Sequence, residues 1–135
     1  MLKTRTISVP IACSIEQAYA FAHHPENFLI WAAGMAGSLR RDGERWVADT
    51  PEGEAEVRFS PPNEYGILDH HVVLPGKPEI YIPLRLIANR EGCELIFTLF
   101  RQPDMDDAAW DRDEALVRKD LATLKALLES PEKAT

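Results

Sequence analysis

The sequence lacks most features that would assign a function directly. It has only two cysteines, Cys13 and Cys93, in 135 residues, and their separation fits neither a zinc site nor a redox motif. Two isolated thiols favour packed apolar groups in a reducing compartment over a disulfide framework. No HExxH, P-loop, GxGxxG or GxSxG pattern occurs, and each absence removes a class of reaction. The sequence therefore predicts no metal, no cofactor and no catalytic residue.

Positive charge and long apolar runs are also scarce. Lysine and arginine number 15 against 22 acidic residues, which gives a formal net charge of −7. No window collects the basic stripe that nucleic acid or an anionic membrane requires. No apolar run approaches the roughly 18 residues of a membrane span, and no signal-peptide core follows the N-terminus. We therefore expect a cytoplasmic protein with no nucleic-acid partner and no membrane span.

The length is that of about one ordinary domain, predicted to cover residues 1–135 with 131–135 as a polar tail. Alternating apolar residues predict a strand over 4–11. Ser14, three residues before Gln17, has the spacing of a capping box, so a short helix should follow. Pro25 ends that helix and is well suited to begin a second one.

Residues 37–101 have the pattern of an antiparallel meander. Asp42 and Gly43 form the tip of one predicted hairpin, and Pro51 to Gly53 turn a second. Further strands are predicted near 65–74, 79–88 and 93–101. The chain then forms a long helix from about Met105 to Glu129, opened by an acidic run that favours the positive end of a helix. Its apolar stripe is Trp110, Val117, Leu121, Leu124 and Leu128.

This order of elements resembles the START-like, polyketide cyclase/dehydrase (SRPBCC) superfamily, which includes the birch-pollen-allergen-like proteins. Two stretches carry the resemblance, "SIEQAYAFAHHPENFLIW" and "LIFTLFRQPDMDDAAWDRDEALVRKDLATLKALLE". It covers essentially the whole chain and includes no catalytic signature. It implies an α+β helix-grip fold, in which a curved antiparallel sheet of six to seven strands, ordered β-α-α-β5/6-α, surrounds the long C-terminal helix.

The widths of the predicted layers suggest an internal space. Six or seven strands about 4.8 Å apart make a sheet about 30 Å wide, whereas one helix is about 10–12 Å across. Large side chains or a bound molecule must take up the rest. The large residues expected to line this space are Trp31, Met35, Trp46, Phe59, Phe97 and Trp110. Whether they enclose a pocket or complete a dry core stays open.

His70 is the candidate polar residue of this space. Adjacent strand residues point to opposite faces, so His70 and His71 cannot bind one metal ion. His70 shares a face with Leu68 and Val72 and should point inward, whereas Asp69 and His71 should point toward solvent. A buried imidazole needs a hydrogen-bonding partner, and the candidates are Arg85, Tyr81 and Asp120. The apolar pattern turns Tyr81 and Arg85 outward, but a shift of one residue in register would reverse this, so both stay candidate pocket residues.

Three functions are compatible with this sequence. The first is binding of a small hydrophobic or amphipathic molecule between sheet and helix. The second, implied by the resemblance, is an aromatase/cyclase-like enzyme with His70 as acid or base and Arg85 or Tyr81 polarising a carbonyl. The third, also implied by it, is a co-chaperone-like interaction module. A homodimer is left open.

Overall fold

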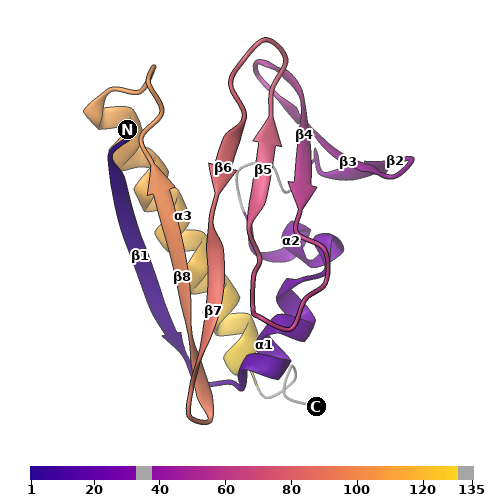
Figure 1. Cartoon of the computed structure of the whole chain (residues 1–135), viewed down its shortest axis with the longest axis vertical. Helices are drawn as coiled ribbons and strands as arrows, with labels where there is room; N and C mark the ends of the chain where they lie inside the picture. Colours follow the sequence, from indigo (N-terminus) through magenta and orange to yellow (C-terminus); the bar gives the residue numbers. More distant parts are fainter. Residues whose placement is uncertain (33–37, 131–135) are drawn as a thin grey trace.

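The computed structural model describes residues 1–32 and 38–130, arranged as in Figure 1. The elements are β1 (Thr4–Ile11), α1 (Ile15–Ala22), α2 (Pro25–Trp31), β2 (Arg40–Asp42), β3 (Arg45–Thr50), β4 (Gly53–Phe59), β5 (His70–Val73), β6 (Ile80–Ile82), β7 (Leu84–Asn89), β8 (Gly92–Phe100) and α3 (Asp107–Glu129). This order confirms the predicted α+β helix-grip architecture.

The strands form two antiparallel sheets instead of the single one expected. One has the order β1-β8-β7 and the other the order β2-β3-β4-β5-β6. The predicted strand over 79–88 is divided at Pro83, between β6 and β7, because proline has no N–H to donate to a neighbouring strand.

Backbone hydrogen bonds join the β1-β8-β7 sheet to the segments that flank β5 and β6 of the second sheet. Leu68 N–H donates to the Leu84 carbonyl at 2.8 Å, Leu86 N–H to Gly66 at 2.9 Å, and Thr98 N–H to Pro83 at 3.1 Å. We call this line of contact the seam. Gly66 has a φ of +74°, and a Cβ at this position would lie 2.5 Å from the Leu86 carbonyl oxygen. Only glycine allows this close approach of the two backbones.

Side-chain caps mark the starts of helices α1 and α3. The Ser14 hydroxyl accepts from Gln17 N–H at 3.2 Å, as the sequence predicts. The Asp106 carboxylate accepts from Ala109 N–H at 2.8 Å, so α3 begins at Asp107, two residues later than expected. Within residues 1–32 and 38–130, no helix is both long and apolar enough to cross a membrane.

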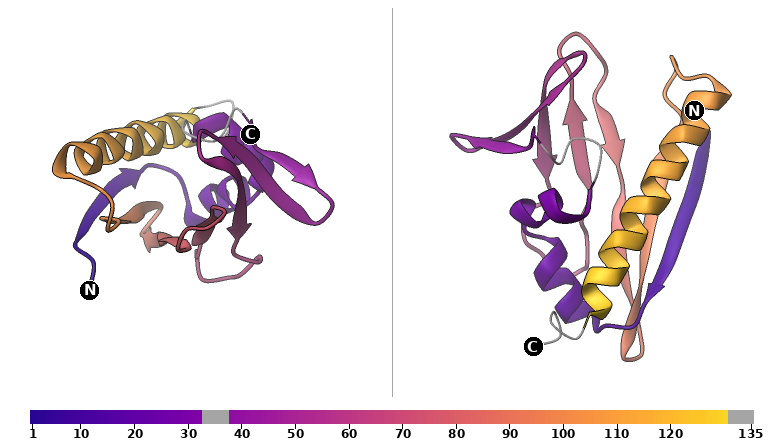
Figure 2. Two further views of the ribbon diagram at one scale, coloured as in Figure 1. Left: turned by 90° about the horizontal axis from the view of Figure 1, so that it is seen from above. Right: turned by 180° about the vertical axis from the view of Figure 1, so that it is seen from behind.

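Helix α3 lies along one face of the β1-β8-β7 sheet, and its C-terminal end lies beside α1 (Figure 2). Leu121 and Leu124 of α3 are fully buried, in one core cluster with Ile7 and Leu95. A second, smaller cluster forms beneath the β2–β4 hairpins around Leu39, Ala48 and Val57. Phe28 of α2 packs against both clusters, so α2 joins the two parts of the core.

Candidate functional site

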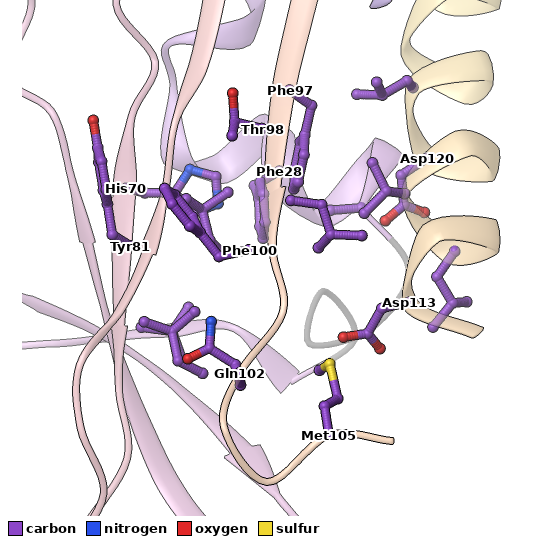
Figure 3. Close-up of a pocket in the computed structure, with 18 of the residues that line it drawn as sticks. Phe28, His70, Tyr81, Phe97, Thr98, Phe100, Gln102, Met105, Asp113 and Asp120 are labelled. Atoms are coloured by element: carbon purple, nitrogen blue, oxygen red, sulfur yellow. The ribbon is translucent and has the colours of Figure 1, made fainter. Parts of the chain in front are cut away.

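A pocket of about 320 Å³ lies between α3, α2 and strands β5, β6 and β8 (Figure 3). Its size falls in the range of small-molecule sites, about 300–1,000 Å³. Most of its wall is apolar and includes Phe28, Trp31, Ile82, Phe97, Leu99 and Val117. The polar lining residues are few: Thr50, His70, Tyr81, Thr98, Gln102, Asp113 and Asp120. The lining residue Trp31 adds an indole N–H that is buried without a hydrogen-bond partner among the described residues.

Strand alternation and helical spacing place these groups. His70 pairs with Ile82 across β5 and β6, so both side chains face the same side of the sheet. On α3, Asp113, Val117 and Asp120 follow one another at intervals of four and three residues, and all three contribute to the lining. The face of α3 toward the pocket therefore carries two carboxylates within an apolar stripe.

His70 is buried, with 4% of its surface exposed. Its Nδ1 lies 3.2 Å from the Leu68 carbonyl oxygen. Because a carbonyl can only accept, Nδ1 carries the proton and Nε2 is the acceptor of the neutral ring. The rings of Phe28 and Phe59 lie 5.5 and 5.9 Å from the imidazole. Burial lowers the pKa of His70 below its usual range, which keeps the ring neutral.

The partner of His70 is thus a backbone carbonyl and none of the three side chains expected. Tyr81 and Arg85 interact instead with Asp69. The Tyr81 hydroxyl donates to Asp69 at 2.7 Å, and Arg85 donates from Nε at 3.1 Å and from Nη2 at 2.8 Å. The acid–base arrangement of His70 with Arg85 or Tyr81 is therefore not assembled.

The expectation that Asp69 points toward solvent is wrong. Its exposed fraction is only 9%, because Tyr81 and Arg85 cover it and Leu84 N–H donates to it at 2.9 Å. Burial alone would raise the pKa of Asp69, but the hydrogen bonds from Arg85, Tyr81 and Leu84 outweigh burial and lower it. His71 does lie on the other face from His70, stacked on Tyr81 with ring centroids 4.9 Å apart.

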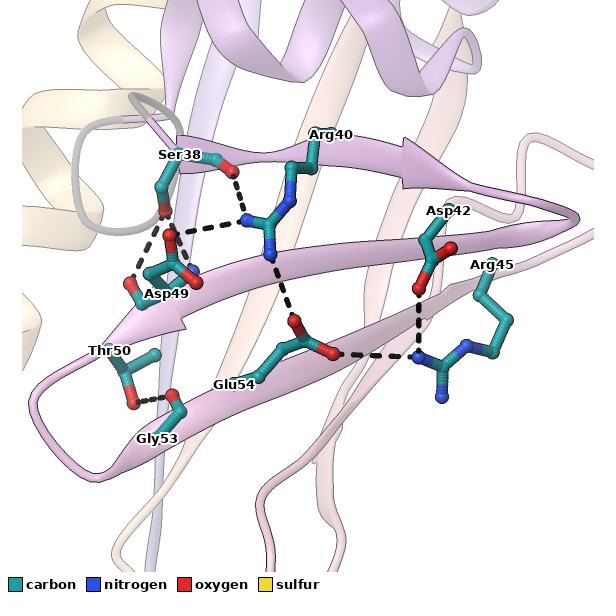
Figure 4. A network of polar contacts seen from close by, with 8 residues as sticks. All are labelled: Ser38, Arg40, Asp42, Arg45, Asp49, Thr50, Gly53 and Glu54. Carbon is teal, nitrogen blue, oxygen red and sulfur yellow. Dashed lines mark hydrogen bonds and ion pairs between the residues drawn. The ribbon is translucent and has the colours of Figure 1, made fainter.

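A second polar cluster, on the β2–β4 hairpins, is solvent-exposed (Figure 4). Arg40 pairs with Asp49 at 3.2 Å and with Glu54 at 2.9 Å, and Arg45 lies 3.5 Å from Glu54. The Ser38 hydroxyl accepts from Asp49 N–H at 3.0 Å. Exposed ion pairs contribute little to stability. We therefore expect each pair in this cluster to stabilise the fold less than the hydrogen bonds to the buried Asp69 do.

The other expected site residues within the described part of the chain lie in four places. Trp31 and Phe97 line the pocket, and Phe59 lines a small neighbouring pocket of about 20 Å³ with His70. Trp46 packs against the apolar cluster of Leu39, Ala48 and Val57 and does not line the pocket. Trp110 is buried at the start of α3, with the guanidinium of Arg5 lying 3.8 Å from its ring centroid. Met35 lies outside the described residues.

Sequence reasoning overlooked Asp113, Thr98 and Gln102 as pocket residues. A signal for Asp113 does exist, since it lies four residues before Val117 on the apolar stripe of α3. Burial raises the pKa of Asp113 despite the attraction of the neighbouring Arg112. No local sequence pattern marks Thr98 and Gln102 as lining residues, because their place at the pocket wall depends on where β8 ends.

Comparison with known proteins yields fold relatives only. No family model matches the chain, and no curated protein matches it. The XoxI protein of Bacillus cereus superposes with a TM-score of 0.75 at 15% identity, covering 97% of this chain and 99% of that one. The Aha1 dimer of Colwellia psychrerythraea gives 0.66 at 15%, covering 95% and 97%. A START superfamily protein of Mycobacterium smegmatis gives 0.64 at 9%, covering 93% and 97%. The chain therefore has the START-like fold that the sequence predicted.

Proposed function

We propose that this protein binds a small hydrophobic or amphipathic molecule in the pocket between α3 and the sheets. The observation that carries the proposal is the pocket itself, about 320 Å³ in volume and walled largely by apolar side chains. Apolar walls with a few polar groups are typical of small-molecule sites. The START superfamily relative has the same fold, which agrees with this function without identifying a ligand.

The apolar wall can supply the affinity. Burying about 200 Å² of ligand surface contributes about 5 kcal/mol before the cost of association. That is enough for micromolar binding only where the pocket is largely preformed. Phe28 belongs to helix α2 and Phe97 to strand β8, and both rings pack in the core, so little ordering is needed when a ligand enters.

The two alternative functions receive less support. The enzyme would need His70 to work with Arg85 or Tyr81, and both of these side chains are engaged with Asp69. An interaction module would need an exposed apolar patch. Leu29 and Ile30 of α2 are exposed, and one fold relative is an Aha1 dimer. The other large apolar side chains that are exposed in the described part of the chain lie on different elements: Met1, Leu2, Tyr65, Tyr81, Ile87 and Leu116.

Filling the pocket tests the proposal. Val117→Phe adds a ring at the pocket wall, whereas Ala115→Phe adds the same ring to an exposed position of the same helix. Titration with decanol, followed by calorimetry, should give binding to the wild type and to Ala115→Phe. Val117→Phe should bind at least about tenfold more weakly, because the added ring takes the space of the ligand. Equal binding by both variants, with both folded, would refute the proposed site.

Native mass spectrometry of protein purified from its own host would identify the natural ligand. We expect a non-covalent adduct that is lost on denaturation. The same adduct should be reduced in Val117→Phe and present in Ala115→Phe.

A further inference from the structure

We propose that the pocket selects an amphipathic molecule whose polar end donates hydrogen bonds, and that it prefers a cationic amine over a carboxylate. This inference rests on the proposed function, because it names the chemistry of the molecule bound there. It follows from three observations on the polar groups of the pocket wall.

The first observation is the sign of the charge. The lining includes the carboxylates of Asp113 and Asp120 and no lysine or arginine among the described residues. Arg85 of β7, an expected pocket residue, is not part of the lining and is paired with Asp69. An anionic ligand would therefore meet the like charge of Asp113 at the pocket wall, and like charges brought together discriminate against a ligand.

The second observation is the state of Asp113. This side chain is half-buried at the pocket wall, and its carboxylate makes no hydrogen bond within the described part of the chain. A partly desolvated carboxylate gains from an ammonium group more than a water-exposed one does, because charge-assisted hydrogen bonds strengthen as water is excluded. A bound amine would supply the donor that Asp113 lacks.

The third observation is the acceptor on the opposite side. Nδ1 of His70 donates to the Leu68 carbonyl, so Nε2 is left as an acceptor. The residue is buried, with an exposed fraction of 4%. Figure 3 shows His70 across the pocket from Asp113 and Asp120. A hydroxyl or amine hydrogen on the ligand would satisfy Nε2, and the oxygen of a ligand hydroxyl would accept from the indole N–H of Trp31, a buried donor at the pocket wall with no partner among the described residues.

These groups fix how a ligand would lie. Its amine would face α3 at Asp113, its apolar body would pack against Phe28 and Phe97, and a further donor would face His70. The side walls between these ends are apolar, so the ligand needs an apolar middle and not a uniformly polar one.

The test uses three probes with the same chain and different ends: decylamine, decanol and decanoate, each kept below its aggregation concentration. Calorimetric titration of the folded wild type should rank the affinities as amine, then alcohol, then carboxylate. One charge-assisted hydrogen bond in a partly buried site corresponds to about tenfold in affinity. We therefore expect the amine to bind at least about tenfold more tightly than the carboxylate.

Asp113→Asn should remove this preference. It should weaken decylamine about tenfold and leave decanol within about twofold of wild type. Asp111→Asn is the matched control, since it removes the same charge from an exposed position of α3 that pairs with Arg5. This control should keep the wild-type ranking, and thermal unfolding of both variants checks that they fold.

The outcomes separate the two proposals. If none of the three probes binds, the proposed function fails. If decanol binds but decanoate binds as tightly as decylamine, the proposed function stands and the preference for a cation is overturned. If Asp111→Asn weakens decylamine as much as Asp113→Asn does, the preference comes from overall charge and the assignment to Asp113 is wrong.

Discussion

Arg85 holds Asp69 through two hydrogen bonds, from Nε to Oδ1 at 3.1 Å and from Nη2 to Oδ2 at 2.8 Å. Arg85 belongs to β7 in one sheet, and Asp69 directly precedes β5 in the other. The carboxylate also accepts from Leu84 N–H. This pair therefore reinforces the backbone hydrogen bonds of the seam.

Asp69→Asn should reduce the free energy of unfolding by about 2 kcal/mol, because the amide cannot accept from all of the donors that meet the carboxylate. Urea unfolding at neutral pH measures the change. Glu54→Gln is the control. Glu54 forms an exposed ion pair with Arg40 on the β2–β4 hairpins, and exposed ion pairs contribute at most about 1 kcal/mol to stability. Similar losses in the two variants would contradict a special role for Asp69.

The contribution of Asp69 should depend on acid pH. Its folded-state pKa is lowered, so below the unfolded value of about 3.9 the unfolded chain binds the proton more readily. The stabilisation is present above that pH and is lost as the pH falls through the folded-state pKa. The difference in stability between wild type and Asp69→Asn should therefore shrink below about pH 4. A difference that stays constant down to acid pH would rule this out.

Burial of His70 should make the free energy of unfolding depend on pH in a higher range than Asp69 does. Burial lowers the folded-state pKa of His70, so below about 6.5 the unfolded chain gains a proton that the folded chain does not. Stability should fall as the pH decreases from about 6.5 toward the folded-state pKa. His70→Gln should show a flatter profile in urea unfolding across this range. Parallel profiles for wild type and His70→Gln would disprove the assignment.

Gly66→Ala should destabilise the seam. The new Cβ would lie 2.5 Å from the Leu86 carbonyl oxygen, and φ is +74°, so we expect a loss of at least about 3 kcal/mol. Gly76→Ala is a matched control, because its φ is +71° but nothing lies within 4 Å of its Cβ; this change should cost only about 1 kcal/mol. Thermal or urea unfolding gives both values. Equal costs would show that the backbone angle alone matters.

Local sequence patterns predicted much of the fold. The alternation in β1, the serine cap of α1 and the apolar stripe of α3 are properties of neighbouring residues, so they could be recognised without coordinates. The inward side of His70 followed in the same way. The division of the sheet at Pro83 was missed, although proline is a known interruption, because its effect depends on which strands lie beside it.

The candidate site was less predictable than the fold. The burial of Asp69 depends on Arg85, which lies 16 residues away, and no local pattern indicates that pairing. Trp46 and Trp110 are as large and apolar as Trp31, but they pack in other parts of the molecule. Residue type alone therefore predicts burial better than it predicts which buried side chains surround the pocket.

The pocket has walls from both sheets and from α3, so its width depends on the angle at which the two sheets meet. Gly66 and Pro83 lie where the two sheets meet, and neither lines the pocket. We expect substitutions at the seam to change the volume of the pocket without changing the side chains that line it. Chains of this fold that differ at the seam would then bind larger or smaller ligands.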